Sequence, residues 1–299
     1  MKFSVCIPTY NRANLIRKPL DSLVNQTFKD FEVLVVDDGS TDDTEVVTKE
    51  YEGKLDLKYI KKPNGGKHTA LNKSLDYAQG ELWVILDSDD EFVETTLEMM
   101  SDIWEKHKAD STICGVIGRS TENGKLIGRP FEEGQKYISY VDYHFGKHAG
   151  EYIDCCECIK TAIINKYRWP ENLNTRFVPE NYVMDQIGLK YRLVIENKTF
   201  FKKIYYKQDG ITLNADEFVR KNIYGYLFNV VSKVEVIIPN AKKGEMTFRA
   251  KIGIWVNYWR MLKMDKTGEG SRVKNITTFG YLCYCYYQAR NIAKLLLRR

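Results

Sequence analysis

Short apolar runs alternate with helical patterns through the first third of the chain, and this alternation limits the possible folds more than any other feature. The apolar runs span 3–7, 31–36, 57–60 and 82–86, and most are continuous, as in strands that are buried on both faces. Between them, 13–25, 42–51 and 67–79 repeat apolar side chains at helical spacing. The pattern predicts an α/β fold with a doubly wound, mostly parallel sheet, right-handed crossovers and helices on both faces.

The rest of the chain is expected to form helices and one hairpin. We expect a helix over 97–104, a hairpin that turns at Asn123 and Gly124, and helices over 216–232, 245–264 and 276–299. Ser40 and Thr41 are candidate caps for the helix near residue 42, and residues 131–169 show no clear pattern. A boundary near Pro239 separates a main domain over 1–238, with halves 1–120 and 121–238, from a basic helical region over 239–299.

Three polar clusters follow the predicted strands, at 8–12, 37–40 and 87–90. The carboxyl ends of parallel strands meet at one edge of a sheet, where ligands bind, so these clusters should line one rim. The last cluster places the carboxylates of Asp87, Asp89 and Asp90 close together, and crowded carboxylates repel unless a cation or a proton joins them. A divalent metal site is one explanation, and ordinary surface or helix-capping acids are the other.

Two common phosphate-binding sites are excluded by the sequence. The first turn reads PTYNRAN and contains no glycine, so the close approach of a pyrophosphate that GxGxxG permits is impossible there. No GxxxxGK[ST] loop is present either. A diphosphate would have to be held by a metal ion that bridges it to the clustered carboxylates.

Four motifs in order resemble the family 2 glycosyltransferases, which have the GT-A fold. These motifs are PTYNR, VVDDGSTDD, NGGKHTALN and LDSDD, and the likeness covers roughly residues 1–120. The resemblance implies an inverting enzyme that uses a nucleotide sugar, usually a UDP-sugar, together with Mn²⁺ or Mg²⁺. It also implies a donor-binding set made of Pro8, Thr9, Tyr10, Arg12, Asp38, Gly66, Lys67, Asp87 and Ser88, with Asp89 as the direct metal ligand.

The resemblance assigns roles to these residues one at a time. Thr9 and Tyr10 match the loop that packs on the base, and Arg12 stands where a basic residue can approach the phosphates. Asp38 resembles the aspartate that accepts the uracil imide N–H, whereas Asp37 is as readily structural as ligand-contacting.

The diphosphate end of the donor falls on two later motifs. Gly66 and Lys67 resemble the loop that closes on the diphosphate. Among the 4 histidines, the neighbouring His68 is the best candidate for a functional role. Asp87 resembles the residue that holds the ribose or the donor sugar. A later stretch, with Tyr206 and residues 209–211, resembles a loop that covers the donor.

Inverting transfer also needs a base that removes the proton of the acceptor hydroxyl. In the family this base often comes from a Glu-Asp pair that opens a helix, and here the pair reads Glu180-Asn181. Glu180 is the predicted base, and the alternative to this role is a favourable charge in a first helical turn. Asp185, one turn later, is the alternative base or a residue that orients Glu180 or the acceptor.

Charge is divided unevenly along the chain. Residues 242–299 contain 13 Lys and Arg but 3 Asp and Glu, a net charge of +10, and since the whole chain carries +5, residues 1–241 carry −5. The basic, aromatic C-terminal helix could contact an anionic membrane surface, or it could pack on a second copy in a homodimer. Nucleic acid is not an expected partner because the acidic part would repel it.

The cysteines and the N-terminus suggest a cytoplasmic protein, peripheral at the inner membrane face if the basic helix binds lipid. The 7 cysteines are an odd number and favour reduced thiols. Cys155, Cys156 and Cys158 with His148 invite a zinc interpretation, but their spacing matches no usual ligand pattern and favours buried thiols. Charge and Pro8 come too early for a signal peptide.

The sequence therefore predicts a metal-dependent, inverting glycosyltransferase. It would transfer a hexosyl or N-acetylhexosaminyl group from the donor to a hydroxyl of a glycan or a polyprenyl-linked glycan, in bacterial surface or capsular polysaccharide synthesis. Two alternatives remain: a sugar-nucleotide-binding protein that lost its base at Asn181, and a nucleotidyltransferase, which builds a similar acidic metal site.

Overall fold

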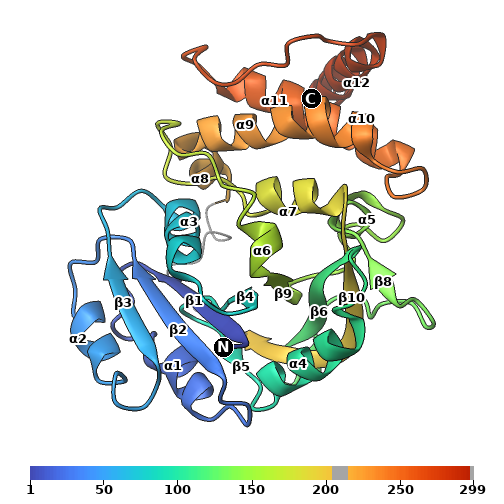
Figure 1. Cartoon of the computed structure of the whole chain (residues 1–299). Helices are drawn as coiled ribbons and strands as arrows, with labels where there is room; N and C mark the ends of the chain where they lie inside the picture. The colour runs from blue at the N-terminus through green and yellow to red at the C-terminus, as the bar shows by residue number, and fades with distance from the viewer. Residues whose placement is uncertain (204–214, 297–299) are drawn as a thin grey trace.

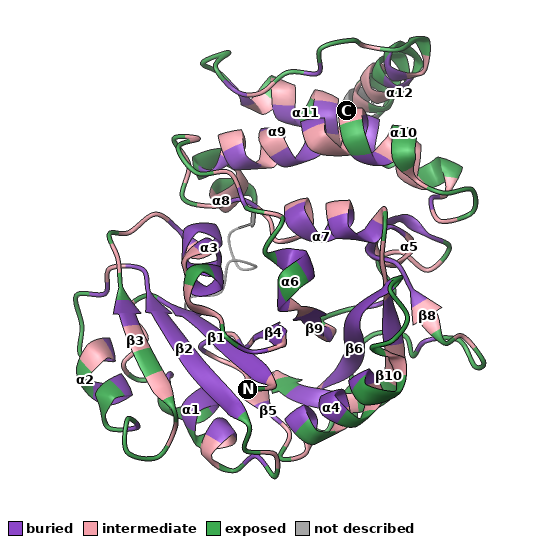
Figure 2. Ribbon diagram, in the orientation of Figure 1, coloured by how far each residue is buried: buried purple, intermediate pink, exposed green. Residues whose placement is uncertain are grey.

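A computed structural model of the chain, which describes residues 1–203 and 215–296, shows a twisted sheet flanked by helices, with a further helical layer above it (Figure 1). The first strands are parallel and lie in the order β3-β2-β1-β4. Every residue of β1 and β2 is buried, which explains their continuous apolar runs (Figure 2). The bounds are β1 Phe3–Thr9, β2 Phe31–Asp37, β3 Leu57–Lys61 and β4 Leu82–Ile85.

The helices between these strands form where the sequence predicted them, but two of them begin later. They are α1 (Arg17–Val24), α2 (Thr44–Lys49) and α3 (Lys67–Tyr77). Before α1, the amides of Leu15 and Ile16 both donate to the Arg12 carbonyl, so this segment forms a turn. Ser40 does not cap α2: its hydroxyl accepts a hydrogen bond from the Asn11 amide at 2.8 Å and ties two rim loops together. The expected role of Ser40 as a cap is therefore wrong.

The second half of the sheet is mixed rather than parallel. Strand β9 (Cys156–Lys160) lies between β4 and β6 (Ile113–Glu122) and runs antiparallel to both, whereas β10 (Arg192–Lys203) runs parallel to β6. The predicted hairpin is present, and Asn123 and Gly124 have φ of 50° and 75°, as a tight hairpin turn requires. The short strands are β5 (Glu91–Phe92), β7 (Lys125–Leu126) and β8 (Tyr137–Ile138).

Helices of the middle segment connect the two halves of the sheet. Helix α4 confirms the expected helix over 97–104, and the segment that showed no clear pattern contains α5, α6 and β9. Helix α7 lies between the sheet and the upper helical layer (Figure 1). The bounds are α4 Thr96–His107, α5 Tyr140–Phe145, α6 Thr161–Ile164 and α7 Asn181–Gly188.

The upper helical layer has its own apolar core. That core joins Leu227, Trp255, Tyr258 and Cys283 with Phe145 of α5. Buried residues on both sides of the predicted boundary near Pro239 belong to the core of this upper helical layer. Its elements are α8 (Ala215–Lys221), α9 (Ile223–Ser232), the π-helical η1 (Lys233–Ile237), α10 (Ile238–Asn240), α11 (Phe248–Met264) and α12 (Thr278–Leu296). Among the described helices, none combines the length and the apolar character needed to cross a bilayer.

Candidate active site

The acidic cluster lies just beyond the end of β4. The amide of Asp90 donates to the Asp87 carbonyl at 3.1 Å, and this turn brings Asp87, Asp89 and Asp90 together. One carboxylate oxygen from each lies within 4.8 Å of the others, and no other group of this kind occurs among the residues that the structure describes. Burial, together with the charge of Asp87, raises the pKa of Asp89. Three half-buried carboxylates suit a hard divalent cation such as Mg²⁺ or Mn²⁺.

Lys67 joins the acidic cluster to the predicted base. Its ammonium lies 2.5 Å from Asp87 and 2.7 Å from Glu180, although the three residues come from α3, the end of β4 and the start of α7. Burial by itself lowers the pKa of Lys67, but the charges of Asp87 and Glu180 outweigh burial and raise it, so the ammonium stays charged. Residues from distant parts of the sequence thus form one charged cluster.

Asp38 holds the loop that leads into α3. It accepts hydrogen bonds from the Gly65 amide at 2.9 Å and the Gly66 amide at 2.6 Å, and Lys62 lies 2.6 Å from it. A carboxylate has about four acceptor positions, so these contacts leave room for one more donor, such as the predicted imide N–H. The neighbouring Asp37 is fully buried and binds the Ser40 amide and the Tyr59 hydroxyl, which supports its structural role.

The first loop offers an exposed ring beside a buried hydroxyl. Pro8 and Thr9 are buried at the end of β1, whereas Tyr10 is 44% exposed and available to stack on a flat ligand. The Thr9 hydroxyl has no hydrogen-bond partner among the described residues. Burial raises the pKa of Asp89, and the charge of Arg12 opposes this effect. Arg12 therefore lies near the acidic cluster.

Gly66 allows the diphosphate loop to touch the segment before the predicted base. Its φ is 96°, and a Cβ there would lie 1.7 Å from the Arg176 carbonyl oxygen. Since no side chain fits, glycine is required at this position. The following His68 is buried, and burial lowers its pKa to about 4, so its ring is neutral at physiological pH.

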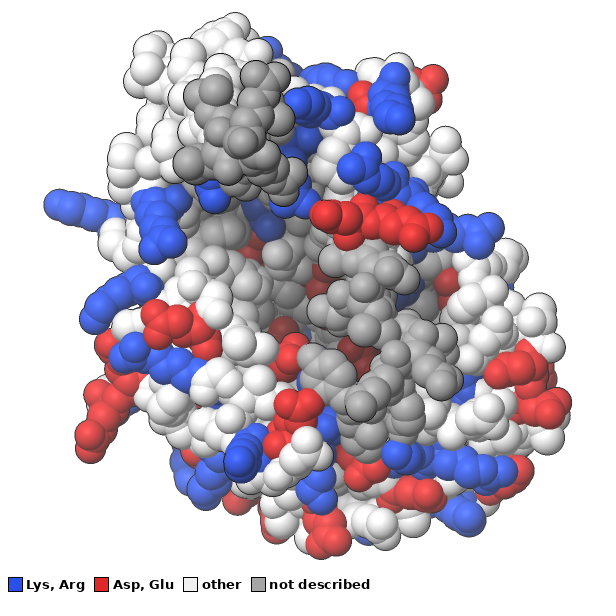
Figure 3. Space-filling model, turned by 180° about the vertical axis from the view of Figure 1, so that it is seen from behind, with Lys and Arg blue, Asp and Glu red and all other residues white. Residues whose placement is uncertain are grey.

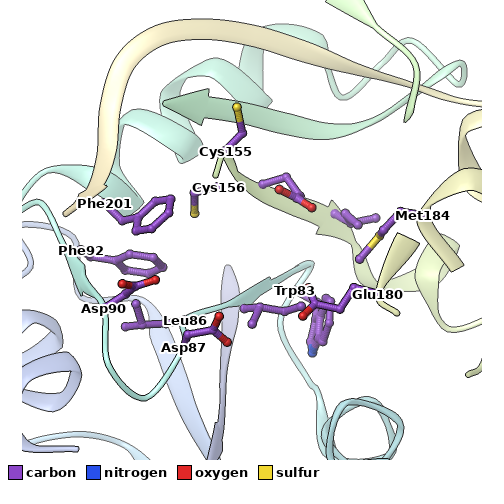
Figure 4. Close-up of a pocket in the computed structure, with 13 residues that line it drawn as sticks. Trp83, Leu86, Asp87, Asp90, Phe92, Cys155, Cys156, Glu180, Met184 and Phe201 are labelled. Atoms are coloured by element: carbon purple, nitrogen blue, oxygen red, sulfur yellow. The ribbon is translucent and has the colours of Figure 1, made fainter. Parts of the chain in front are cut away.

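A pocket of about 90 Å³ opens beside the charged cluster, and Asp87, Asp90 and Glu180 border it (Figure 4). Trp83 and Met184 form part of its apolar wall. Seen from behind, the molecule is hollowed between the sheet and the upper helical layer, and acidic side chains show inside the hollow (Figure 3). Ser88, the remaining predicted donor residue, is buried and does not line the pocket.

The two other candidates in the base segment face away from this pocket. Asp185 is 1% exposed, lies 2.5 Å from His144 Nδ1 and 3.7 Å from Lys233 Nζ, and does not line the pocket. This burial favours the orienting role of Asp185 over its role as the base. Asn181 accepts a hydrogen bond from Asn229 of α9 at 2.9 Å. The missing aspartate therefore removes no carboxylate from the pocket.

The sequence analysis missed two residues near the site. Lys62 pairs with Asp38, and Glu157 of β9 lines the pocket. Glu157 stands among cysteines that attracted a zinc interpretation; Cys156 and Cys158 are buried free thiols, as predicted. A glutamate inside an otherwise apolar strand was the available signal. The predicted donor-covering loop at Tyr206 and 209–211 lies outside the described residues.

Two curated proteins illustrate the similarity at the sequence level. The chain is 30% identical over 239 residues to the GalNAc(5)-diNAcBac-PP-undecaprenol beta-1,3-glucosyltransferase of Campylobacter jejuni, covering 76% of this chain and 72% of that protein. It is 28% identical over 288 residues to the minor teichoic acid biosynthesis protein GgaB of Bacillus subtilis, covering 88% of this chain. The chain spans only 29% of the length of GgaB.

Solved structures of similar fold include two sugar-nucleotide complexes. Staphylococcus aureus TarS 1–349 in complex with UDP-GlcNAc superposes with a TM-score of 0.60 at 22% identity, over 88% of this chain and 72% of that one. The mannosyltransferase PcManGT from Pyrobaculum calidifontis, in complex with GDP-Man and Mn²⁺, superposes with a TM-score of 0.60 at 19% identity, over the same shares. These likenesses establish the GT-A fold.

A sequence model of one family covers more than half of the chain. The family described as Glycosyl transferase family 2 matches residues 4–167, a range that contains the four rim motifs and strand β9. Together with the Campylobacter relative, this match confirms the resemblance seen in the motifs. The chain belongs to glycosyl transferase family 2 and is a glycosyltransferase.

Proposed function

We propose that the protein transfers a sugar from a UDP-sugar to a hydroxyl group of a lipid-linked glycan, with inversion at the anomeric carbon and with a divalent cation. The observation that carries this proposal is the double contact of Lys67 with Asp87 and Glu180, at 2.5 and 2.7 Å. This double contact joins Asp87, which is predicted to hold the donor, to Glu180, the predicted base, and both residues border one pocket. The donor is supported by the UDP-GlcNAc complex of TarS, and the acceptor by the name of the Campylobacter relative.

The reaction assigns one step to each charged residue. Glu180 accepts the proton of the acceptor hydroxyl group. At the same time, the oxygen of that hydroxyl group attacks the anomeric carbon on the face opposite the diphosphate. The new carbon–oxygen bond forms as the bond to the diphosphate breaks, and the electron pair leaves with UDP. Lys67 at the start of α3, together with Arg12, faces the negative charge that grows on the diphosphate.

The acidic cluster fits the metal that the family uses. Asp89 would hold Mn²⁺ or Mg²⁺, with Asp87 and Asp90 beside it, because these cations prefer several carboxylate oxygens. When bound, such an ion neutralises charge on the diphosphate.

The metal site can be tested with Asp89→Ala. We expect metal-dependent UDP binding to weaken and transfer to fall by roughly 10²-fold or more, the usual effect of removing charge stabilisation from a leaving group. The measurements are calorimetric titration with UDP, with and without Mn²⁺, and a donor hydrolysis assay. The control is Glu94→Ala, since Glu94 is an exposed acid a few residues further on. Normal metal dependence in Asp89→Ala would refute the assignment.

The same assays separate this function from its alternatives. A protein that binds nucleotide sugars without transfer would bind UDP-sugar but release no UDP, and a nucleotidyltransferase would form UDP-sugar from UTP and a sugar phosphate. The structure weakens the first alternative, because Asn181 faces Asn229 while Glu180 lies in the pocket.

A further inference from the structure

Glu157 is an acidic residue in the centre of the sheet, and the proposed reaction gives it no role. It lies on β9, paired with Ile117 of β6, and β9 is bordered on its other side by β4. Side chains alternate along a strand, so Glu157 shares a face with Ile159, while Cys158 points into the core on the opposite face. Both Glu157 and Ile159 line the pocket that contains Asp87 and Glu180. Glu157 therefore reaches the pocket from the sheet.

The positive charge of Lys67 favours the ionised form of this carboxyl group, but it does so without forming an ion pair. Within residues 1–203 and 215–296, no ion pair involves the half-buried Glu157, although acidic residues shielded from water are normally paired. Glu157 is also absent from the group of carboxylates that lie close enough to share a metal ion. A metal role would require a place in that cluster.

The surroundings of Glu157 favour hydrogen bonding to a neutral polar group. Burial, reinforced by the charge of Glu180, raises the pKa of Glu157 to about 8, so at neutral pH it is mostly protonated and can both donate and accept. Burial raises the pKa of Tyr140, and the charge of Glu157 is the next largest cause. The two side chains therefore lie near each other. The Tyr140 hydroxyl also acts on Glu157 as a hydrogen-bond donor and lowers the pKa of Glu157 against burial, although their contact falls short of good hydrogen-bond geometry. Glu157 thus lies at one wall of the pocket with Tyr140 behind it, and its carboxyl group keeps further hydrogen-bonding capacity.

We propose that Glu157, with Tyr140 behind it, forms a subsite that binds a hydroxyl group of the sugar in this pocket and thereby helps to select that sugar. The proposal rests on the proposed function, because the pocket lies between Asp87, assigned to the donor, and Glu180, assigned to the acceptor hydroxyl. A sugar hydroxyl is neutral and can donate and accept, which matches a protonated carboxyl group without a cation. The hydroxyl can belong to the donor sugar or to the acceptor sugar.

The test uses Glu157→Leu, Glu157→Gln and Tyr140→Phe in the full chain. Calorimetric titrations with UDP, UDP-glucose, UDP-galactose and UDP-GlcNAc measure donor binding with Mn²⁺, and acceptor KM is measured separately. For a donor subsite, Glu157→Leu should weaken binding of the preferred UDP-sugar roughly 10-fold, the effect of losing one or two hydrogen bonds, while UDP affinity stays within about twofold. For an acceptor subsite, acceptor KM should rise instead, with donor affinity unchanged.

Glu157→Gln and Tyr140→Phe distinguish binding from other roles. Glutamine keeps the shape and the hydrogen bonds, so Glu157→Gln should restore most of the lost affinity, and Tyr140→Phe should produce a smaller shift in the same constant. The proposal is overturned if sugar affinity, acceptor KM and sugar preference are unchanged in Glu157→Leu, or if UDP binding falls equally. A collapse of kcat in Glu157→Gln would identify Glu157 as a base instead. If the unmodified protein binds no UDP-sugar, the proposed function itself fails, and that result is distinct from all of these.

Discussion

Lys67 is the residue on which the arrangement of the site depends most. Asp87 and Glu180 both lie against its ammonium, and without that charge the two carboxylates would repel each other across the pocket. Lys67 opens α3, where the helix dipole also favours negative charge on a nearby ligand. The same side chain can therefore hold Asp87 and Glu180 together and meet a diphosphate.

The proposed role of Glu180 as the base predicts how its replacement by glutamine changes the rate of transfer. Glu180→Gln keeps the shape and the hydrogen bonds but cannot accept a proton, so transfer should fall roughly 10²-fold or more while UDP-sugar affinity changes little. Steady-state kinetics and calorimetric titration measure the two quantities. Glu171→Gln is a matched control, because Glu171 is an exposed acid that hydrogen-bonds Asn72. Equal losses in binding and rate would indicate a structural role for Glu180.

At the scale of elements, α9 and η1 position the segment that carries the base. A Cβ on Gly225 of α9 would lie 1.9 Å from the Phe177 carbonyl oxygen, so this helix packs directly on the chain before Glu180. Asn222, just before α9, accepts a hydrogen bond from the Arg176 amide, and Asn229 donates to Asn181. Lys233, in the π-helical η1, reaches Asp185 of α7. The upper helical layer is thus attached to the active site by close packing and polar contacts.

The contact between η1 and α7 predicts a large effect on stability. Lys233→Met removes a buried cation and leaves Asp185 with His144 as its remaining partner, so the free energy of unfolding should fall by roughly 3 kcal/mol. Urea unfolding at pH 7 measures this change, and Lys263→Met, which alters an exposed lysine of α11, is the control. The double variant with Asp185→Asn should recover part of the loss because it removes the uncompensated charge. An unchanged unfolding midpoint in Lys233→Met would show that the ion pair contributes nothing.

At the scale of the whole molecule, the upper helical layer combines basic charge with exposed apolar side chains. Lys and Arg side chains are spread over this layer in Figure 3, and residues 242–299 carry +10. Helix α12 exposes Tyr281, Leu282, Tyr286 and Ile292, and the most exposed of these, Leu282, is 63% accessible. Aromatic and apolar side chains beside basic residues are typical of helices that lie in a membrane interface.

Vesicle binding tests this surface. The full chain should sediment with anionic vesicles more than with neutral ones, binding should weaken as salt rises, and Leu282→Gln with Tyr286→Gln should lose most of the remaining affinity. Val46→Gln is the matched control, because Val46 is an equally exposed apolar residue on α2, far from α12 in the chain. If anionic vesicles bind nothing at low salt and the unmodified chain runs as a dimer that the double variant separates, the face is a dimer interface.

The sequence by itself determined the parallel half of the sheet in this protein. Strands β1 to β4 and helix α3 were predicted from local periodicity, and the rim motifs follow because parallel strands end at one edge. The base candidate Glu180 also followed from a local motif. These features depend on residues close together in the chain, or on a rule that holds for every sheet of this type.

Only the tertiary structure decided which of the remaining residues share a pocket. Strand β9 inserts antiparallel beside β4 and brings Glu157 to the pocket, while Lys233 of η1 contacts Asp185, which does not line the pocket. Ser40 accepts a hydrogen bond from the Asn11 amide instead of capping α2, which is again a contact with a distant part of the chain. Each outcome depends on partners that are distant in the sequence, such as Ser40 and Asn11, which are 29 positions apart. Contacts of this kind leave no periodic trace in the chain, because the partner that decides them is chosen by packing after the elements have formed.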